Sequence, residues 1–348
     1  MKGIFNNRRG FGVEIEFLVP RETEISCWSG SLNTVLAEKI AGHQELIDSN
    51  TTCKAEKYNH TTKTYWKIVS DVSVKGDSTY TGNHEIVSPI LYGKNGKQQL
   101  KAVLQVLREQ NCKVNRTCGI HVHHDVTELM LAGRRVAKKF LKNICLFVVK
   151  YEHIIYKLLP QSRQSEMYSQ PARNKIGGLP LFRCLQQNVD AKKNVKYTIT
   201  HNVDSDVERH YSECGSNFGT VKSGIQHGSE KRYSGLNLQN IWTRGSVEFR
   251  YMQGSLNFNK IWSWVVLTQA IVNTNEKASR VVLTDIQSNE HGFFHLRKSL
   301  GLIGYANRCV ETRFANKWTK IKWGKFSTNG SYALNTVGYY GSTVTESL

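Results

Sequence analysis

The sequence lacks the features that mark membrane, secreted and zinc-ribbon proteins. Its longest apolar run, residues 144–149, is far short of the roughly 20 residues that a membrane span needs. None of the eight cysteines forms a CxxC pair or a zinc-ribbon spacing. Residues 1–9 lead directly into the first expected strand, so we expect no signal peptide. These absences predict a cytoplasmic protein with reduced thiols and no membrane partner.

Acidic residues are scarce relative to basic ones. The chain has 47 lysines and arginines against 28 aspartates and glutamates, which gives a formal net charge of +19. This excess favours anionic partners such as nucleotides, nucleic acid or acidic polymers, although a basic surface can equally serve solubility alone. Charge by itself therefore names no substrate.

No linker, repeat or low-complexity run divides the chain. We expect one catalytic domain over residues 1–303, with a weakly periodic insertion or lid at 160–228, and a basic, aromatic extension at 304–348. Residues 318–326 of this extension interleave aromatics with lysines. That pattern suits either bases stacked beside neutralised phosphates or a hairpin packed on the body.

Hydrophobic periodicity predicts the main helices and strands. Helices are expected at 32–46, 98–110, 259–273 and 290–300, with one long helix or a bent pair at 127–159. Strands are expected at 11–17, 65–72, 84–89, 120–123, 196–199, 233–241 and 245–253.

Three of these strands carry charged or imidazole side chains on every second residue. The pairs are Glu14 with Glu16, His121 with His123, and Glu248 with Arg250. Successive side chains of a strand point to opposite faces, so each segment buries one face and offers ionic ligands on the other. His124 falls on the apolar face, and we expect it to be structural.

The spacing of these side chains favours hard divalent cations. Glu14 and Glu16 are expected about 6.5 to 7 Å apart, which suits two neighbouring Mg²⁺ or Mn²⁺ ions better than one. One imidazole among the carboxylates is compatible with these ions and also with zinc. The cluster would be completed by Glu85, His121 and Glu248. Arg250 would place a planar guanidinium against phosphate oxygens.

Each pair alone has an ordinary structural explanation. An isolated ExE pair is usually solvated, an HxH pair is as often structural as ligating, and an ExR pair is most often a cross-strand salt bridge. The coincidence of all three, on strands with matching alternation, favours a metal and phosphate site.

Two basic motifs favour structural explanations. Residues 93–97 lack the spacing and the Ser or Thr of a P-loop, so we expect a turn at a helix start. A second motif at helical spacing is more typical of a solvated face than of an anion site. It consists of Arg134, Arg135, Lys138, Lys139 and Lys142.

The order of the motifs along residues 11–271 is specific. The motifs are 12–17 with Glu14 and Glu16, 71–73 with Asp71, 85–89 with Glu85, 119–123 with His121 and His123, Tyr233 with Asn237, and 247–250 with Glu248 and Arg250. This order resembles the amidoligase family, which belongs with glutamine synthetase and glutamate-cysteine ligase to the carboxylate-amine ligase superfamily. The resemblance implies an α+β, glutamine-synthetase-like fold, in which helices pack on one face of a curved, mainly antiparallel sheet. The active site would lie on the concave face.

The resemblance also implies an ATP-dependent ligase. Such an enzyme phosphorylates a carboxylate, and an amine then displaces phosphate from the acyl phosphate to leave an amide. The cofactors would be ATP and Mg²⁺ or Mn²⁺. By the superfamily's pattern, Glu14, His121 and Glu248 would hold the ion on the nucleotide phosphates. Glu16 and Glu85 would hold the ion nearer the carboxylate, while Arg250 would neutralise the transferring phosphoryl group.

Five further residues are candidates for the catalytic site. The resemblance assigns Asp71 to amine or metal positioning. Arg163 and Arg232 are candidates for binding phosphate or a substrate carboxylate, although a loop arginine in solvent is about as common. His123 and Asn237 complete the set.

Two functions from other classes stay open. A metal-dependent nuclease or phosphodiesterase would use the same carboxylates and histidines, because two ions can flank an in-line attack on a phosphodiester. A non-catalytic nucleic-acid-binding protein would use the basic tail and bind in a strongly salt-dependent way. For the ligase, the carboxylate and amine substrates can belong to an anionic macromolecule such as nucleic acid, to a protein or to a metabolite.

Overall fold

The computed structural model describes residues 5–22, 31–160, 163, 185–189, 195–199, 234–238, 240–281, 295–296 and 298–300. The chain forms two compact units. One unit contains Asn7–His124 and Met252–Val265, and the second contains Met1–Asn6, Asp125–Tyr251 and Val266–Leu348. The expected boundary at residue 303, the tail beyond it and most of the expected lid lie outside the described residues.

The unit with Asn7–His124 is built on a mixed sheet. Its strands lie in the order β2 (Cys53–Ala55), β3 (Trp66–Val69), β4 (Tyr80–Val87), β1 (Phe11–Pro20) and β5 (Gly119–Asp125). The pair β2 and β3 is parallel, and the other pairs are antiparallel. The expected strands at 11–17, 65–72, 84–89 and 120–123 are present in outline, and β2 is an addition that the polar sequence around it concealed.

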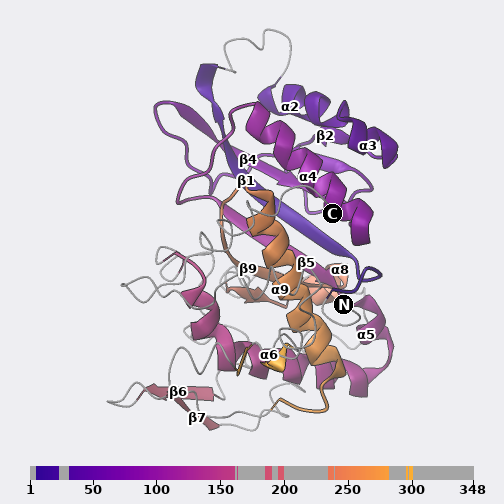
Figure 1. Ribbon diagram of the computed structural model, residues 1–348, viewed down its shortest axis with the longest axis vertical. Coiled ribbons are helices and arrows are strands. Elements are labelled where there is room, and N and C mark those ends of the chain that lie inside the picture. Colours follow the sequence, from indigo (N-terminus) through magenta and orange to yellow (C-terminus); the bar gives the residue numbers. More distant parts are fainter. Residues whose placement is uncertain are drawn as a thin grey trace, which may run out of the picture. The chain divides into compact units, whose positions relative to one another are not determined.

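The apolar face of this sheet is the core of the unit. Phe11, Val13, Ile15 and Phe17 of β1 are buried, and Ile15 lies opposite both Ile86 and Ile120. Helices α2 (Leu32–Ala41), α3 (Gln44–Asp48) and α4 (Gly93–Glu109) lie together beside the strands (Figure 1).

Two contacts tie helices to the apolar face. Nε1 of Trp66 on β3 donates a hydrogen bond of 3.1 Å to Oε1 of Gln99 on α4. Trp262 of α9 (Phe258–Lys277) packs its ring edge to face with Phe11, at 5.9 Å between centroids. With helices on the apolar side, the alternating polar side chains of β1, β4 and β5 occupy the opposite face.

The helix expected at 32–46 is two helices, which corrects the prediction. Gly42 caps the end of α2, and Nδ1 of His43 accepts a hydrogen bond from the N–H of Glu45 to begin α3. A histidine cap is not one of the common N-cap residues, so the apolar periodicity concealed the break. Residues 93–97 form the first turn of α4, as expected for a helix start, and α4 begins earlier than the predicted residue 98.

The second unit contains the expected bent pair of helices. These are α5 (Thr127–Leu131) and α6 (Arg134–Lys157), and Gly133 separates them with a φ of 108°. The expected strand at 196–199 is β7 (Val195–Ile199), which pairs with β6 (Leu185–Val189). β9 (Ser246–Gln253) pairs antiparallel with the short β8 (Leu236–Asn237).

The strand expected at 233–241 is largely wrong. Within the described part of that range only the two-residue β8 forms a strand, and α8 (Asn240–Arg244) occupies its end. Gly245, with a φ of 67°, then turns the chain into β9. Of the helices in the described part of the chain, none has the length and apolar character to cross a bilayer. Helices and largely antiparallel strands together give an α+β architecture.

Candidate functional site

The register of the sheet brings the expected ligands of β1, β4 and β5 to one face. Glu14 lies opposite His121 of β5, and Glu16 lies opposite Glu85 of β4. Directly opposed residues of neighbouring strands share a face, with Cβ atoms about 4.5 to 5.5 Å apart. Because β1 lies between β4 and β5, its two carboxylates meet partners from both sides.

Histidine side chains contact both carboxylates of β1. Nδ1 of His121 lies 2.9 Å from Oε2 of Glu14, and its Nε2 lies 3.7 Å from Oε1 of Glu16. Nε2 of His123 lies 3.2 Å from Oε1 of Glu14. The main-chain N–H of Gly119 donates to Oε2 of Glu16 at 2.6 Å. One imidazole therefore bridges the two carboxylates and fixes their spacing.

The histidines also set the charge of Glu14. Burial by itself raises the pKa of this carboxyl, but His123 and His121 outweigh burial and hold the pKa well below its usual value. Glu14 is therefore ionised at neutral pH. An ionised carboxylate is the form that binds a cation.

Glu16 and Glu85 form a second, more buried part of the cluster. Each is 5% exposed, and the two are directly opposed across β1 and β4. Like charges in this position destabilise a sheet, and buried charges are costly unless they are compensated. Asp71, between β3 and β4, adds a third carboxylate whose Oδ1 accepts from the N–H of Ser73 at 2.7 Å. A multivalent cation is the partner that would compensate the charge of these three carboxylates.

Two overlapping sets of ligand atoms exist within this unit. Glu14, Glu85 and His121 each offer one atom, and these atoms lie within 4.8 Å of one another. Glu16, Asp71 and Glu85 form a second set, whose ligand atoms also lie within 4.8 Å of one another. Both sets are rich in carboxylate oxygen and share Glu85, which suits two neighbouring Mg²⁺ or Mn²⁺ ions better than zinc.

Glu248 and Arg250 lie on β9 in the other unit, where they form a tight cluster of their own. Oε2 of Glu248 accepts from Nδ2 of Asn237 at 2.7 Å and from Nδ2 of Asn240 at 2.6 Å. Its Oε1 accepts from Nη1 of Arg250 at 2.5 Å. Glu248 is only 2% exposed, and Asn237 is its direct partner in the β8–β9 register. These bonds hold both the carboxylate and the guanidinium in fixed orientations.

Residues 7–272 match the sequence model of the family described as "Putative amidoligase enzyme". The chain belongs to the amidoligase family. The match spans β1, β4, β5 and β9 and so contains every site residue discussed above. Family membership confirms the resemblance and indicates a ligase. Among curated proteins, no sequence matches this chain significantly.

Lys67 is a residue of this amidoligase that the sequence analysis missed. Val87 of β4 lies opposite both Lys67 of β3 and Glu14 of β1, so Lys67 shares the face of the carboxylates. Its Nζ donates to the carbonyl O and Oδ1 of Asn59, both at 2.8 Å, and to the carbonyl O of Thr61 at 2.9 Å. The signal was present, because a lysine between Trp66 and Ile68 in an expected strand must point away from the apolar face.

Arg163 makes main-chain contacts that the sequence did not predict. It is 3% exposed, and its Nε and Nη2 donate to the carbonyl oxygens of Tyr251 at 3.2 Å and of Arg250 at 3.1 Å. These bonds stabilise the backbone of β9 next to Arg250. A role for Arg163 in binding phosphate or carboxylate stays a prediction, which these contacts do not support. Arg232 lies outside the described residues.

His124 is structural, as expected from its position in β5. It lies opposite Phe11 on the apolar face and is fully buried. Burial, together with the charges of Arg9 and His123, lowers the pKa of His124 well below its usual value. The ring is therefore neutral at physiological pH, in contrast to the carboxylates on the opposite face.

Proposed function

We propose that this amidoligase is an ATP-dependent carboxylate-amine ligase that forms an amide through an acyl phosphate. The observation that carries the proposal is the register of β1, which puts Glu14 opposite His121 and Glu16 opposite Glu85 on one polar face. Opposed acids at a buried position destabilise the sheet. The binding of cations, together with the phosphates that these cations carry, would compensate the charge of the opposed acids.

The proposed metal ligands divide between two ions. Glu14, His121 and Glu248 would hold the ion on the nucleotide phosphates, and Glu16 with Glu85 would hold the ion nearer the carboxylate. Mg²⁺ or Mn²⁺ at these positions would neutralise charge on the nucleotide and on the transferred phosphoryl group. Support comes from the ligand sets around Glu85 and from the ionised state of Glu14.

The protein's own side chains have distinct proposed roles. Arg250 would bind oxygens of the transferring phosphoryl group, and its bond to Glu248 orients the guanidinium before substrate arrives. Asn237 would position Glu248. His123 would keep Glu14 ionised, and Asp71 would position the amine or a metal ion.

We also propose that the fold is glutamine-synthetase-like. Support comes from the unit with Asn7–His124, where helices pack on the apolar face of a mainly antiparallel sheet. The candidate ligands lie on the opposite face.

The test is a nucleotide assay across a panel of carboxylates and amines. ADP and phosphate should appear only when a suitable carboxylate, a suitable amine and Mg²⁺ are all present. Glu16→Gln and Glu248→Gln should each lower turnover by at least about 100-fold, since even indirect partners of a metal typically contribute 10- to 100-fold. Glu38→Gln, at an exposed position on α2, is the matched control and should retain full activity.

Two results would contradict the proposal. One is turnover that survives either ligand substitution. The other is Mg²⁺-dependent cleavage of DNA or RNA without ATP, abolished by Glu16→Gln, which would assign the same carboxylates to a nuclease.

A further inference from the structure

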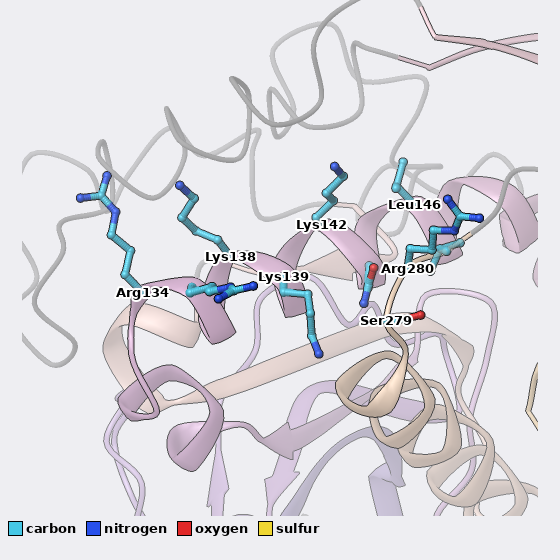
Figure 2. A pocket seen from close by; sticks show the side chains of 10 residues that line it. Arg134, Lys138, Lys139, Lys142, Leu146, Ser279 and Arg280 are labelled. Carbon is cyan, nitrogen blue, oxygen red and sulfur yellow. The ribbon is translucent and has the colours of Figure 1, made fainter.

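A basic groove runs along the first half of α6, on residues that the proposed ligase chemistry does not use. Its volume is about 550 Å³, and its walls come from α6 and from the segment after α9 (Figure 2). We call it the α6 groove. It is lined by Arg134, Arg135, Lys138, Lys139, Lys142, Asn143, Leu146, Ser279, Arg280 and Val281. Every ionisable residue in this described lining is an arginine or a lysine.

The cations of α6 stand in rows along the helix. Arg134, Lys138 and Lys142 are spaced four residues apart, so they form a row about 12 Å long. Figure 2 shows these three side chains projecting from the same side of α6. Arg135 and Lys139 form a second row. The sequence has no acidic residue between Glu128 and Glu152, so α6 supplies no counter-charge along this stretch.

A buried asparagine fixes the other wall of the α6 groove. Asn143 is 2% exposed, and its Nδ2 donates to the carbonyl oxygens of Asn275 at 3.3 Å and of Ala278 at 2.9 Å. These bonds hold the end of α9 against α6 and so set the path of the next residues. Arg280, which is exposed, lines the groove from this wall. The cations therefore surround a concave surface with a defined shape.

The charge pattern works against the stability of α6. Cations of like sign at positions i and i+4 repel one another on a helix. Arg134 and Arg135 also lie in the first turn, where the helix dipole is positive and acidic residues are the stabilising choice. A face that served solubility alone could mix both signs. The arrangement therefore points to a negatively charged ligand.

We propose that the α6 groove binds the phosphate backbone of a nucleic acid strand without reading its sequence. Arginine forks bind two phosphate oxygens at once, and rows of cations match the regular charge of the backbone. The described lining contains no aromatic ring on which bases could stack, so its contacts would be to phosphates. A concave wall also fits a strand better than it fits a flat lipid surface.

The test compares two variants that remove the same charge from different places. The groove variant is Arg135→Gln/Lys139→Gln/Arg280→Gln, and the control is Lys39→Gln/Lys94→Gln/Lys101→Gln. All six positions are exposed, and the control residues lie on α2 and α4 in the other unit. Binding of a fluorescein-labelled single-stranded oligonucleotide to the full chain is measured by anisotropy, between about 50 and 200 mM salt.

We expect the groove variant to bind about 100-fold more weakly at about 0.1 M salt. The slope of log K against log salt should fall in magnitude by about 2, because each lost phosphate contact removes about 0.7. The control should stay within about threefold of the native protein, because none of its three lysines lines the α6 groove. Arg280→Gln alone, outside any helix, should lower the slope by about 0.7. Thermal unfolding checks that each variant is folded.

Three outcomes would overturn the proposal. They are no binding by the native protein, equal losses in the two triple variants, and a groove variant that loses binding to phosphatidylserine vesicles while oligonucleotide binding is unchanged. The Glu16→Gln variant separates this proposal from the ligase chemistry. It should bind the oligonucleotide as the native protein does, whether or not the ligase assignment holds.

Discussion

The buried ammonium group of Lys67, on the ligand face, is stabilised by hydrogen-bond acceptors of the neighbouring loop. Its ammonium group is bound by three acceptors of residues 59 and 61, and the side chain is 3% exposed. Burial of an ammonium group is costly unless its N–H donors form hydrogen bonds. The loop before β3 is therefore tied to the sheet face that carries Glu14 and His121.

Replacing Lys67 should destabilise the protein. Lys67→Met keeps the length of the side chain but leaves the acceptors of Asn59 and Thr61 without their donor, which should cost about 2 to 3 kcal/mol in urea unfolding. Lys63→Met is the control, because Lys63 is 31% exposed and lies 4.0 Å from its acidic partner Glu56. It should change the unfolding free energy by less than about 0.5 kcal/mol. Equal effects from the two changes would show that the ammonium contacts of Lys67 contribute nothing.

At the level of single residues, the sequence shows which side chains share a face but not which ones meet. The alternation in β1 and β5 is local, so Glu14 with Glu16 and His121 with His123 could be predicted as pairs. The opposition of Glu16 and Glu85 depends on the register between β1 and β4, which the core packing and loop lengths decide. The contacts of Arg163 with the backbone of β9 are likewise long-range and have no local signal.

Close approaches of the backbone determine how β4 begins. A Cβ atom at Gly82 would overlap the carbonyl O of Val74 and the backbone N of Gly76. Both are main-chain atoms and cannot rotate away. The strand that carries Glu85 therefore requires glycine at this point.

Gly82→Ala should cost about 3 kcal/mol, because the overlap forces the backbone of the turn away from β4. Gly12→Ala on β1 is the matched control. The nearest atoms to a Cβ there, in His123 and Ser88, are 3.7 Å away, which is ordinary contact. Thermal unfolding of the two variants provides the comparison, and a Gly82→Ala protein as stable as the Gly12→Ala protein would contradict the account of the turn.

At the level of elements, helices with a long hydrophobic pattern could be predicted from the sequence, and short helices and strands could not. The periodicity of α4 and α9 extends over several turns, and both helices were predicted. The break at Gly42 and His43 and the short strands β2 and β8 involve only a few residues each. Packing in the folded chain, rather than local preference, decides such elements.

Buried cysteines report on the folding of the unit with Asn7–His124. Burial raises the pKa of both Cys53 and Cys112 to about 12, from a usual value of 9.0. The folded protein therefore keeps these thiols protonated where the unfolded chain begins to lose the proton. This contribution to stability is complete below about pH 9 and is lost as the pH rises from about 9 towards 12.

Cys53 and Cys112 should resist alkylation in the native protein. With iodoacetamide at pH 8, neither thiol should react until the protein unfolds, because the reactive thiolate is scarce and the sulfurs are inaccessible. Peptide mass spectrometry with and without urea measures the labelling. The unfolding free energy should also fall above about pH 9. Rapid native labelling at both sites would show that this unit opens readily.

For the whole molecule, the sequence indicated the family and the α+β architecture, both of which are now shown. The order of the short motifs was enough to identify the family, although the exact boundaries of the strands were not predicted. The division into two units was not predicted, because the boundary falls inside β9 and inside α9, where no change of composition marks it. The charge of +19 indicated an anionic partner but could not locate the α6 groove.

The central claim is that the carboxylates and imidazole opposed across β1 bind divalent cations together with ATP. It is tested most directly by anomalous X-ray diffraction from crystals grown with Mn²⁺ and a non-hydrolysable ATP analogue. We predict manganese peaks at bonding distance, about 2.0 to 2.3 Å, from oxygens of Glu14, Glu16 and Glu85 and from a ring nitrogen of His121. Nucleotide bound with its manganese on other residues, and no peak at these four, would contradict the account.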